Sequence, residues 1–412
     1  MAGELTTKHK HILWKPFDEE YLAHQRLEAP ILSSRASACY KPVQDLESKQ
    51  MLKNFLHTND YVGQYERFTA SLQYTLAYGF RIVTGEEWQL KASHECLKNI
   101  EAAAKPGGWI VDALPFLNNL PATFTPWKRT AENWYQLWNE LHVANMQGAL
   151  QREGWNWMKD LKASREAQQM TDEELAWDVG VLCDGGVETT SKMLQVFTLA
   201  CLAFPGWIPI AQKELDDVVG SSRLPEYPDL DHLPYTRAVV EESFRWRHIT
   251  PIGIPHATTQ DDFYKGYFIP KASTIIPVFA AMRSDAALYD SPSVFRPERW
   301  IGKTQPNNFG YGRRVCPGRF IARNSVTIAL ARLLWAFNIR SKDGCSIPVV
   351  DESMFRDEIV SGPKPFEAVF EPRSEGHRRV IEEAYEGVEK DTAKMLNQIY
   401  EEQVSAGLSQ RA

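Results

Sequence analysis

Apolar residues recur at helical spacing through most of residues 1–205, which predicts that helices dominate the first half of the chain. The strongest such pattern runs from Thr171 to Phe204. It opens with a capping box, in which the side chains of Thr171 and Glu174 each accept from the other residue's backbone N–H, and it stops at a Pro-Gly pair. About 34 residues at 1.5 Å each make roughly 50 Å, so this helix is long enough to cross a whole domain.

The second half predicts shorter elements. A helix ends within residues 239–248, and strand-like pieces follow it in "DFYKGYFIP" and "TIIPVFA". A proline-rich stretch at 291–300 precedes an apolar helix at 319–337. Because helices dominate and strands gather late, we expect a mainly α fold with small β-sheets (α+β), in one domain over residues 1–373. Residues 374–412 are expected to form a charged, helical and peripheral tail.

The composition is that of an ordinary globular protein. The 412 residues carry a net charge of −7 and the pI is near 5.9, which argues against a nucleic-acid partner. The six cysteines have no zinc-ligand or redox spacing, which favours free thiols in a reducing compartment. No apolar run reaches the ~18 residues of a membrane span, and the polar N-terminus has no signal-peptide core. As written, the chain is expected to be cytoplasmic, without a membrane anchor.

One cysteine lies in an unusual setting. Cys316 falls in "NNFGYGRRVCPG", a loop of asparagines, glycines and arginines without an apolar run. Cysteine is usually a small buried hydrophobe, whereas the cations Arg313 and Arg314 beside this one favour a thiolate. The loop leads into a helix whose N-terminal amides stabilise an anion, and its glycines let the backbone approach a flat ligand. A metal ligand and a nucleophile both fit this description.

The loop resembles F-x-x-G-x-R-x-C-x-G, the haem-binding loop of the haem-thiolate monooxygenases, the cytochrome P450 family. Every fixed position matches: Phe309, Gly312, Arg314, Cys316 and Gly318. The resemblance implies a cytochrome P450-like fold and haem b as cofactor, with the Cys316 thiolate as the proximal iron ligand. It further implies that Phe309 shields the sulfur and that Arg314 pairs with a haem propionate.

Two more motifs resemble the same family and follow in its order. "ESFR" supplies Glu242 and Arg245, and "FRPERW" supplies Arg299. By the resemblance, these three residues form a buried network that supports the haem loop. Taken alone, a Glu and an Arg three residues apart on a helix often form only a surface pair.

The long helix carries "GGVETT" at 185–190, which is similar to the family's [A/G]-G-x-[D/E]-T-[T/S]. A glycine inside a helix costs roughly 1 kcal/mol against alanine, so something should compensate, such as a ligand pressed against the backbone. The resemblance implies that Glu188 and Thr189 form an acid–alcohol pair that delivers protons to dioxygen. The alternative is a glycine pair used for helix packing, with a surface glutamate.

Two further assignments concern the haem propionates. His256 lies where the family often contacts a propionate, although a lone histidine is as often a simple hydrogen-bonding residue. The helix expected at 21–32 lacks the family's W-x-x-x-R, because Tyr21 and Gln25 hold those positions. The neighbouring Arg26 is the candidate replacement.

The resemblance extends from about residue 11 to about residue 373. Family members usually begin with a membrane anchor for the endoplasmic reticulum, a proline-rich hinge and early strands. None of these precedes the helix at 21–32, so we expect either a shortened form or a sequence without its first part.

The resemblance implies a haem-dependent monooxygenase that inserts one atom of dioxygen into an apolar small molecule, in secondary metabolism. Its electrons would come from NADPH through a cytochrome P450 reductase. Arg319 and Arg323 share a helix face beside the loop and either help to dock this reductase or are simply solvated side chains. Two alternatives stay open. One is a truncated, non-catalytic haem-binding remnant, and the other is a cysteine hydrolase, which needs a histidine base near Cys316.

Overall fold

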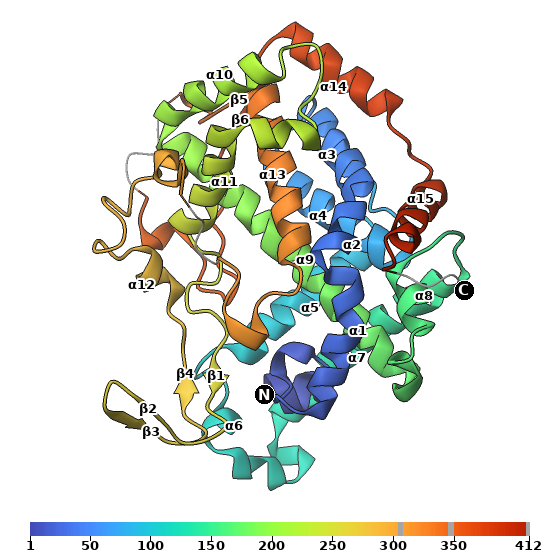
Figure 1. Ribbon diagram of the computed structural model, residues 1–412. Helices are drawn as coiled ribbons and strands as arrows, with labels where there is room; N and C mark the ends of the chain where they lie inside the picture. Colours follow the sequence, from blue (N-terminus) through green and yellow to red (C-terminus); the bar gives the residue numbers. More distant parts are fainter. Residues whose placement is uncertain (304–307, 345–349, 409–412) are drawn as a thin grey trace.

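The computed structural model describes residues 1–303, 308–344 and 350–408, and it is a helical body with small sheets (Figure 1). The helices of the first half are α1 (Glu19–Leu32), α2 (Ser34–Cys39), α3 (Lys41–Phe55), α4 (Tyr61–Tyr78), α5 (Trp88–Ala104), α6 (Ile110–Ala113), α7 (Pro126–Gln151), α8 (Trp157–Lys162) and α9 (Asp172–Ala203). The second half adds α10 (Ile208–Val218), α11 (Pro234–Trp246), α12 (Phe279–Arg283), α13 (Arg319–Ala336), α14 (Glu375–Gly387) and α15 (Thr392–Ser405). The strands are β1 (His256–Ala257), β2 (Asp262–Tyr264), β3 (Tyr267–Ile269), β4 (Thr274–Ile275), β5 (Phe337–Arg340) and β6 (Val369–Pro372). The mainly α fold with small, late strands is confirmed.

Helix α9 runs through the centre of the body (Figure 1). It has the predicted capping box, with Thr171 as N-cap and Glu174 as its partner, and it ends at Ala203. Its C-terminal half is buried on every side, because α4, α11 and α13 pack against it. A helix that is apolar all round is stable only in such an interior, and this position places the "GGVETT" motif at the middle of the molecule.

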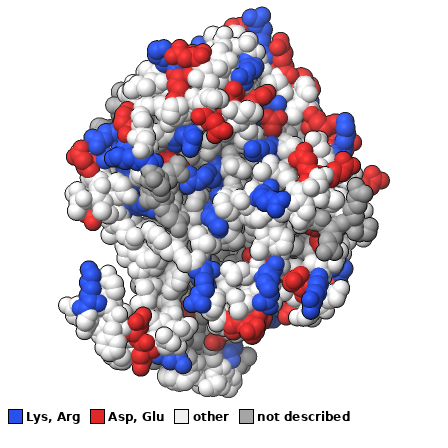
Figure 2. All heavy atoms as spheres, in the orientation of Figure 1, with Lys and Arg blue, Asp and Glu red and all other residues white. Residues whose placement is uncertain are grey.

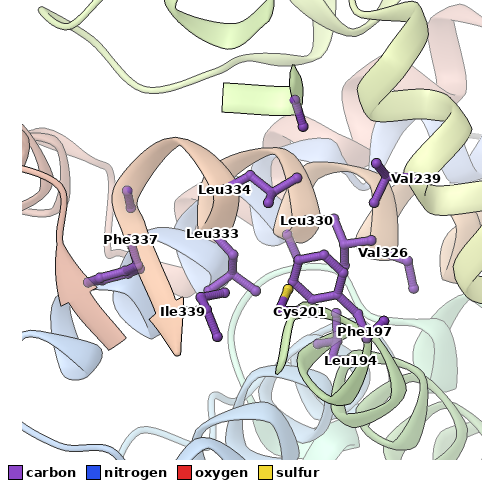
Figure 3. Close-up of a cluster of buried hydrophobic side chains, with 14 of the residues drawn as sticks. Leu194, Phe197, Cys201, Val239, Val326, Leu330, Leu333, Leu334, Phe337 and Ile339 are labelled. Atoms are coloured by element: carbon purple, nitrogen blue, oxygen red, sulfur yellow. The ribbon is translucent and has the colours of Figure 1, made fainter. Parts of the chain in front are cut away.

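The main core forms between α9, α13 and β5. Figure 3 shows the apolar side chains of this cluster converging from the three elements: Leu194, Phe197 and Cys201 of α9, Val326, Leu330, Leu333 and Leu334 of α13, and Phe337 and Ile339 of β5. Val239 of α11 completes the contact. Because α13 begins directly after the cysteine loop, this packing anchors the loop to the rigid centre.

The strands form antiparallel pairs: β1 with β4, β2 with β3, and β5 with β6. The β2–β3 hairpin turns through Lys265 and Gly266, whose positive φ angles of 49° and 84° suit a type I′ turn. In the first pair His256 lies opposite Ile275, and both side chains are exposed. The β1–β4 and β2–β3 pairs therefore border the body and contribute little to its core, whereas Phe337, Ile339 and Phe370 of the β5–β6 pair are buried in it.

The C-terminal segment is helical, as predicted, but α15 is not peripheral. Met395, Leu396 and Ile399 are at most 3% exposed and belong to a second core cluster with residues of α2, α3 and α4. Gln403 also donates to the buried Tyr40 hydroxyl at 3.1 Å. The prediction from charge alone missed this contact, because the apolar residues of α15 form a narrow stripe among many charges.

The surface carries both signs of charge, with Lys and Arg side chains interspersed among Asp and Glu side chains over the face drawn in Figure 2. Among the described residues, no single helix is both long and apolar enough to cross a membrane. The segments Asp172–Ala203 and Pro205–Val218 meet that condition only as a pair, and they are bent by 90° at their junction.

Candidate functional site

Cys316 lies where its loop turns into α13. Its backbone N–H donates to the Phe309 carbonyl oxygen at 2.9 Å, which closes the loop. Gly310 and Gly312 have φ angles of 87° and 64°, in the left-handed region that glycine adopts without strain. Gly318 is the N-cap residue of α13. The glycines thus bend the chain so that a half-buried thiol sits at the N-terminus of an 18-residue helix.

The charge nearest the thiol comes from Arg319. Burial raises the pKa of the Cys316 thiol, and the backbone N–H groups of Gly318 and Arg319 together with the Arg319 guanidinium oppose that rise. Arg319 also donates to the Cys316 carbonyl oxygen at 2.9 Å. The prediction named Arg313 and Arg314 as the cations beside the sulfur, but in this structure neither of them sets its pKa.

Arg313 and Arg314 instead hold the loop to the first helices of the chain. Arg313 lies over the Phe17 ring, 4.3 Å from its centroid, and Arg314 lies over the Tyr21 ring at 3.6 Å. Arg314 also donates to the Lys15 carbonyl oxygen at 2.7 Å. A contact between Arg314 and a haem propionate therefore stays a prediction.

Glu242, Arg245 and Arg299 meet in the interior, where their exposures are 0%, 0% and 7%. Arg245 donates to both carboxylate oxygens of Glu242, at 2.8 and 2.7 Å, and Arg299 Nε donates to the same carboxylate at 3.3 Å. Trp300 Nε1 and the Arg296 backbone N–H each donate to it as well, at 2.9 Å. Glu242 and Arg245 are therefore not a surface pair. With Arg299 they form one buried network between α11 and the proline-rich stretch at 291–300.

A second link joins α11 directly to the cysteine loop. Arg323 of α13 donates to Glu241, and the Asn308 side-chain amide donates to the same carboxylate at 3.5 Å. The His248 ring lies 3.0 Å from the Asn308 carbonyl oxygen. Arg323 is thereby engaged in an ion pair within the molecule, with 31% of its side chain exposed. No sequence signal identifies this group, because its members are scattered between positions 241 and 323.

The two residues of the acid–alcohol motif are adjacent on α9. The Thr189 hydroxyl donates to the Gly185 carbonyl oxygen at 2.7 Å. The Glu188 carboxylate lies 2.6 Å from the ammonium of Lys192, one helical turn later. Burial raises the pKa of Glu188, and Lys192 lowers it. The sequence did not single out Lys192, although its i, i+4 spacing from Glu188 is a recognisable signal.

The two glycines of the motif have different surroundings. A Cβ at Gly186 would lie 2.3 Å from Gln73 Cδ, so the Gln73 side chain of α4 packs directly on the α9 backbone at this glycine. A Cβ at Gly185 would meet no atom within 4 Å, and Gly185 is exposed. Helix packing thus explains Gly186, whereas the open space at Gly185 leaves room for a ligand against the backbone.

The two alanine variants should therefore differ in stability. Gly185→Ala should raise the unfolding free energy of the apoprotein by up to about 1 kcal/mol, because alanine is the better helix former. Gly186→Ala should be less stable than Gly185→Ala by about 1–3 kcal/mol, because the added methyl group overpacks the contact with Gln73. Urea unfolding of the two variants measures the difference. Equal midpoints would contradict the packing role of Gly186.

His256 and Arg26 are both exposed, on β1 and α1 respectively. The two positions of α1 that contact the cysteine loop are Tyr21 and Gln25, which donate to the Arg313 carbonyl oxygen at 3.4 and 3.2 Å. The structure therefore does not bring Arg26 to this contact. Propionate roles for His256 and Arg26 stay predictions.

A buried polar cluster that the sequence did not indicate lies beside the motif. Asp184 accepts from the Ser93 hydroxyl of α5 at 2.7 Å, and its second oxygen lies 3.1 Å from His142 Nε2 of α7. A buried carboxylate needs such partners to offset its desolvation. The cluster ties α5 and α7 to α9 one residue before the glycine pair. An aspartate in an otherwise apolar stretch of helix was the available signal.

The remaining cysteines do not join the site. Among the described residues, Cys39, Cys96, Cys183, Cys201 and Cys316 are free, as predicted. Cys345 lies outside the described residues. Burial raises the pKa of Cys96, Cys183 and Cys201, so these thiols are inert core side chains.

Comparisons with known proteins agree with the loop motif. A family model described as Cytochrome P450 matches residues 66–370. The chain is 37% identical over 396 residues to the cytochrome P450 monooxygenase drtD of Aspergillus calidoustus, covering 95% of this chain and 75% of that protein. It is 34% identical over 410 residues to the cytochrome P450 monooxygenase aneD of Aspergillus aculeatus, covering 97% and 79%.

A solved structure shows the same fold. The chain superposes on a zebrafish cytochrome P450 with abiraterone at a TM-score of 0.72 and 22% identity, over 90% of this chain and 87% of the other. The family match and the loop motif together exclude the alternative that the chain is a cysteine hydrolase. The chain belongs to the cytochrome P450 family and is a monooxygenase with haem iron as its cofactor.

Proposed function

We propose that this monooxygenase inserts one atom of dioxygen into an apolar small molecule, with electrons from NADPH through a cytochrome P450 reductase. The observation that carries the proposal is the half-buried Cys316 thiol, presented by its glycine loop at the N-terminus of α13. Similarity to monooxygenases of Aspergillus species supports a role in fungal secondary metabolism.

The residues present fit haem. Haem brings four nitrogen ligands of its own, so one strong protein ligand suffices, and Cys316 would supply it. A Cβ at Gly185, Gly312 or Gly318 would meet no atom within 4 Å, so the backbone at these positions leaves room for a flat group. By the family motif, Phe309 would lie beside the sulfur, and Arg314 would contact a propionate.

Bound haem supplies the activation of dioxygen, and the chain supplies orientation and protons. The Thr189 hydroxyl donates to Gly185, and its oxygen lone pairs remain able to accept a hydrogen bond from water. Glu188, next to it, is the acid that can pass a proton to that water. The pair can thus pass a proton from the Glu188 carboxylate to a water held at the Thr189 hydroxyl.

The proposal is tested by expressing the chain with haem and recording the spectrum of the reduced protein with carbon monoxide. We expect a thiolate-type Soret band. With reductase, NADPH and ¹⁸O-labelled dioxygen, an apolar substrate should gain one labelled oxygen atom. A protein that shows the band but makes no product over a broad panel of apolar compounds would instead favour the non-catalytic haem-binding remnant.

Replacing Thr189 with alanine should uncouple electron flow from product. Thr189→Ala should keep haem and consume NADPH, while the product formed per NADPH falls by about tenfold or more, because a positioned proton-transfer group contributes on the order of 10²–10⁴ in rate. Peroxide should account for the lost product, and assays of NADPH, peroxide and product measure it.

The matched control is Thr327→Ala. Thr327 makes the same hydrogen bond to the carbonyl one turn back, at 2.7 Å, on α13. Its loss should leave coupling unchanged. Coupling that is unchanged in Thr189→Ala as well would remove Thr189 from proton delivery.

A further inference from the structure

Lys192 is a buried lysine that binds the acid of the motif. Lys192 is 8% exposed and lies in the C-terminal half of α9, which is in the interior. The ammonium lies 2.6 Å from Glu188 Oε1 and 2.8 Å from Glu358 Oε2, and it also donates to the Val360 carbonyl oxygen. An ammonium has three N–H donors, so these three acceptors satisfy all of them.

The partner segment at residues 358–362 is held in place from two sides. The Glu101 carboxylate of α5 accepts from the backbone N–H groups of Ile359 and Val360, at 2.7 and 3.0 Å. The aliphatic part of Lys192 packs against Gly362, where a Cβ would come within 2.9 Å of Lys192 Cγ. The segment is therefore shaped around this lysine, which connects Glu188 to Glu358, a residue 166 positions after Lys192 in the sequence.

Charged and titratable groups of both signs surround Glu188. Glu101 and Glu358 raise the pKa of Glu188 in addition to burial, and Lys192 opposes them. On the neighbouring helices, His94 of α5 faces Glu188, and Glu66 of α4 interacts with Lys192 and lies 3.7 Å from His94. Arg356 lies 3.6 Å from the second oxygen of Glu358 and faces Glu66. Lys192 is the base in direct contact with the Glu188 carboxylate.

We propose that Lys192 is a positioning residue that orients the Glu188 carboxylate, keeps it ionised between proton transfers, and couples it to the segment at residues 358–362. The inference rests on the proposed function in that Glu188 is taken as the proton-delivering acid. The lysine is independent of the family motif, which specifies only the acid and the alcohol.

Removal of either charged partner should shift the Glu188 titration, in opposite directions. Without the ammonium, the half-buried carboxylate has lost its counter-charge and binds a proton more readily, so its pKa rises. Without the Glu358 carboxylate, Glu188 is the one carboxylate left in direct contact with the ammonium and a like charge is gone, so the pKa of Glu188 falls. A merely structural role for Lys192 would not produce this pair of opposite shifts.

The test is an infrared titration of the holoenzyme. The carboxylic-acid band of Glu188 is assigned by its absence in Glu188→Gln. In Lys192→Met the midpoint of this band should move up by about one pH unit or more, and in Glu358→Gln it should move down. Lys192→Arg should restore a midpoint near that of the wild type. Lys213→Met is the control, because Lys213 makes an i, i+4 pair with Asp217 at 2.6 Å on an exposed helix face, and it should shift nothing.

Unchanged midpoints in Lys192→Met and Glu358→Gln would overturn the proposal, and so would shifts of the same sign. If Lys192→Met does not fold, Glu358→Gln and Lys192→Arg still decide the question. The titration requires neither turnover nor reductase. A missing thiolate band in the wild type would therefore defeat the proposed function alone, whereas the titration by itself decides on Lys192.

The pH dependence of coupling supplies a second readout. Since Glu188 in Lys192→Met should stay protonated to higher pH, the pH at which product per NADPH is half-maximal should move up together with the infrared midpoint. A coupling profile that moves without the infrared midpoint would show that Lys192 acts on something other than Glu188, which also contradicts the proposal.

Discussion

Cys316→Ser should lose the thiolate-type Soret band of the reduced, carbon-monoxide-bound protein, and turnover should fall below detection. Serine has nearly the same size, and the Cys316 contact that closes the loop is made by the backbone N–H to Phe309. The fold should therefore survive, while the soft anionic sulfur that donates electron density to haem iron is gone. The carbon-monoxide difference spectrum and a product assay measure the two losses.

The matched control is Cys39→Ser. Cys39 is a free thiol, 9% exposed, at the end of α2, and its Sγ lies 3.6 Å from the Arg35 carbonyl oxygen. This variant should keep both the band and the activity. Persistence of the thiolate band in Cys316→Ser would show that another group binds the iron.

Glu242→Gln should have the largest effect on stability. The glutamine has the shape of the glutamate but no charge, so Arg245 and Arg299 are left as buried cations without a counter-charge. Breaking a buried ion pair by removing one partner costs ~3–5 kcal/mol, against a total stability of ~5–15 kcal/mol for a typical domain. We expect a sharp fall in soluble yield and in the urea midpoint, and weaker retention of haem.

The adjacent Glu241 provides the control on the same helix. Burial raises the pKa of Glu241 to about 7, and Arg323 partly opposes this. Below that pH the folded protein holds Glu241 largely protonated, so Glu241→Gln replaces one neutral group with another. It should cost far less than Glu242→Gln at pH 6. Similar losses in the two variants would mean that the Glu242 network has no special role in stability.

The sequence by itself predicted the main helices and Cys316 as the candidate iron ligand. The bounds of α9 and α13 follow from local physics: a capping box, a proline stop, a glycine N-cap and an apolar period of 3.6. The cysteine motif is equally local, because its glycines and its cysteine lie within ten positions of each other. Such features depend on neighbouring residues, so they can be recognised without a tertiary structure.

The tertiary structure decided how distant residues share these elements. Arg313 and Arg314 were expected to act on the sulfur, yet they bind the segment around Phe17 and Tyr21, because the fold brings aromatic rings and a carbonyl oxygen of that segment within reach of their guanidinium groups. The apolar stripe of α15 is part of the core only because α2 and α3 cover it.

Contacts between residues distant in the sequence also explain what the sequence analysis missed around Glu188. Gly186 looked like space for a ligand and proved to be the contact for Gln73 of α4. Lys192 and Glu358 lie 166 positions apart, and their charge pairing depends on how the loop at residues 358–362 returns to α9. A sequence records which side chains can form an ion pair, whereas burial and distance, which set its strength and the pKa of Glu188, come only from the folded chain.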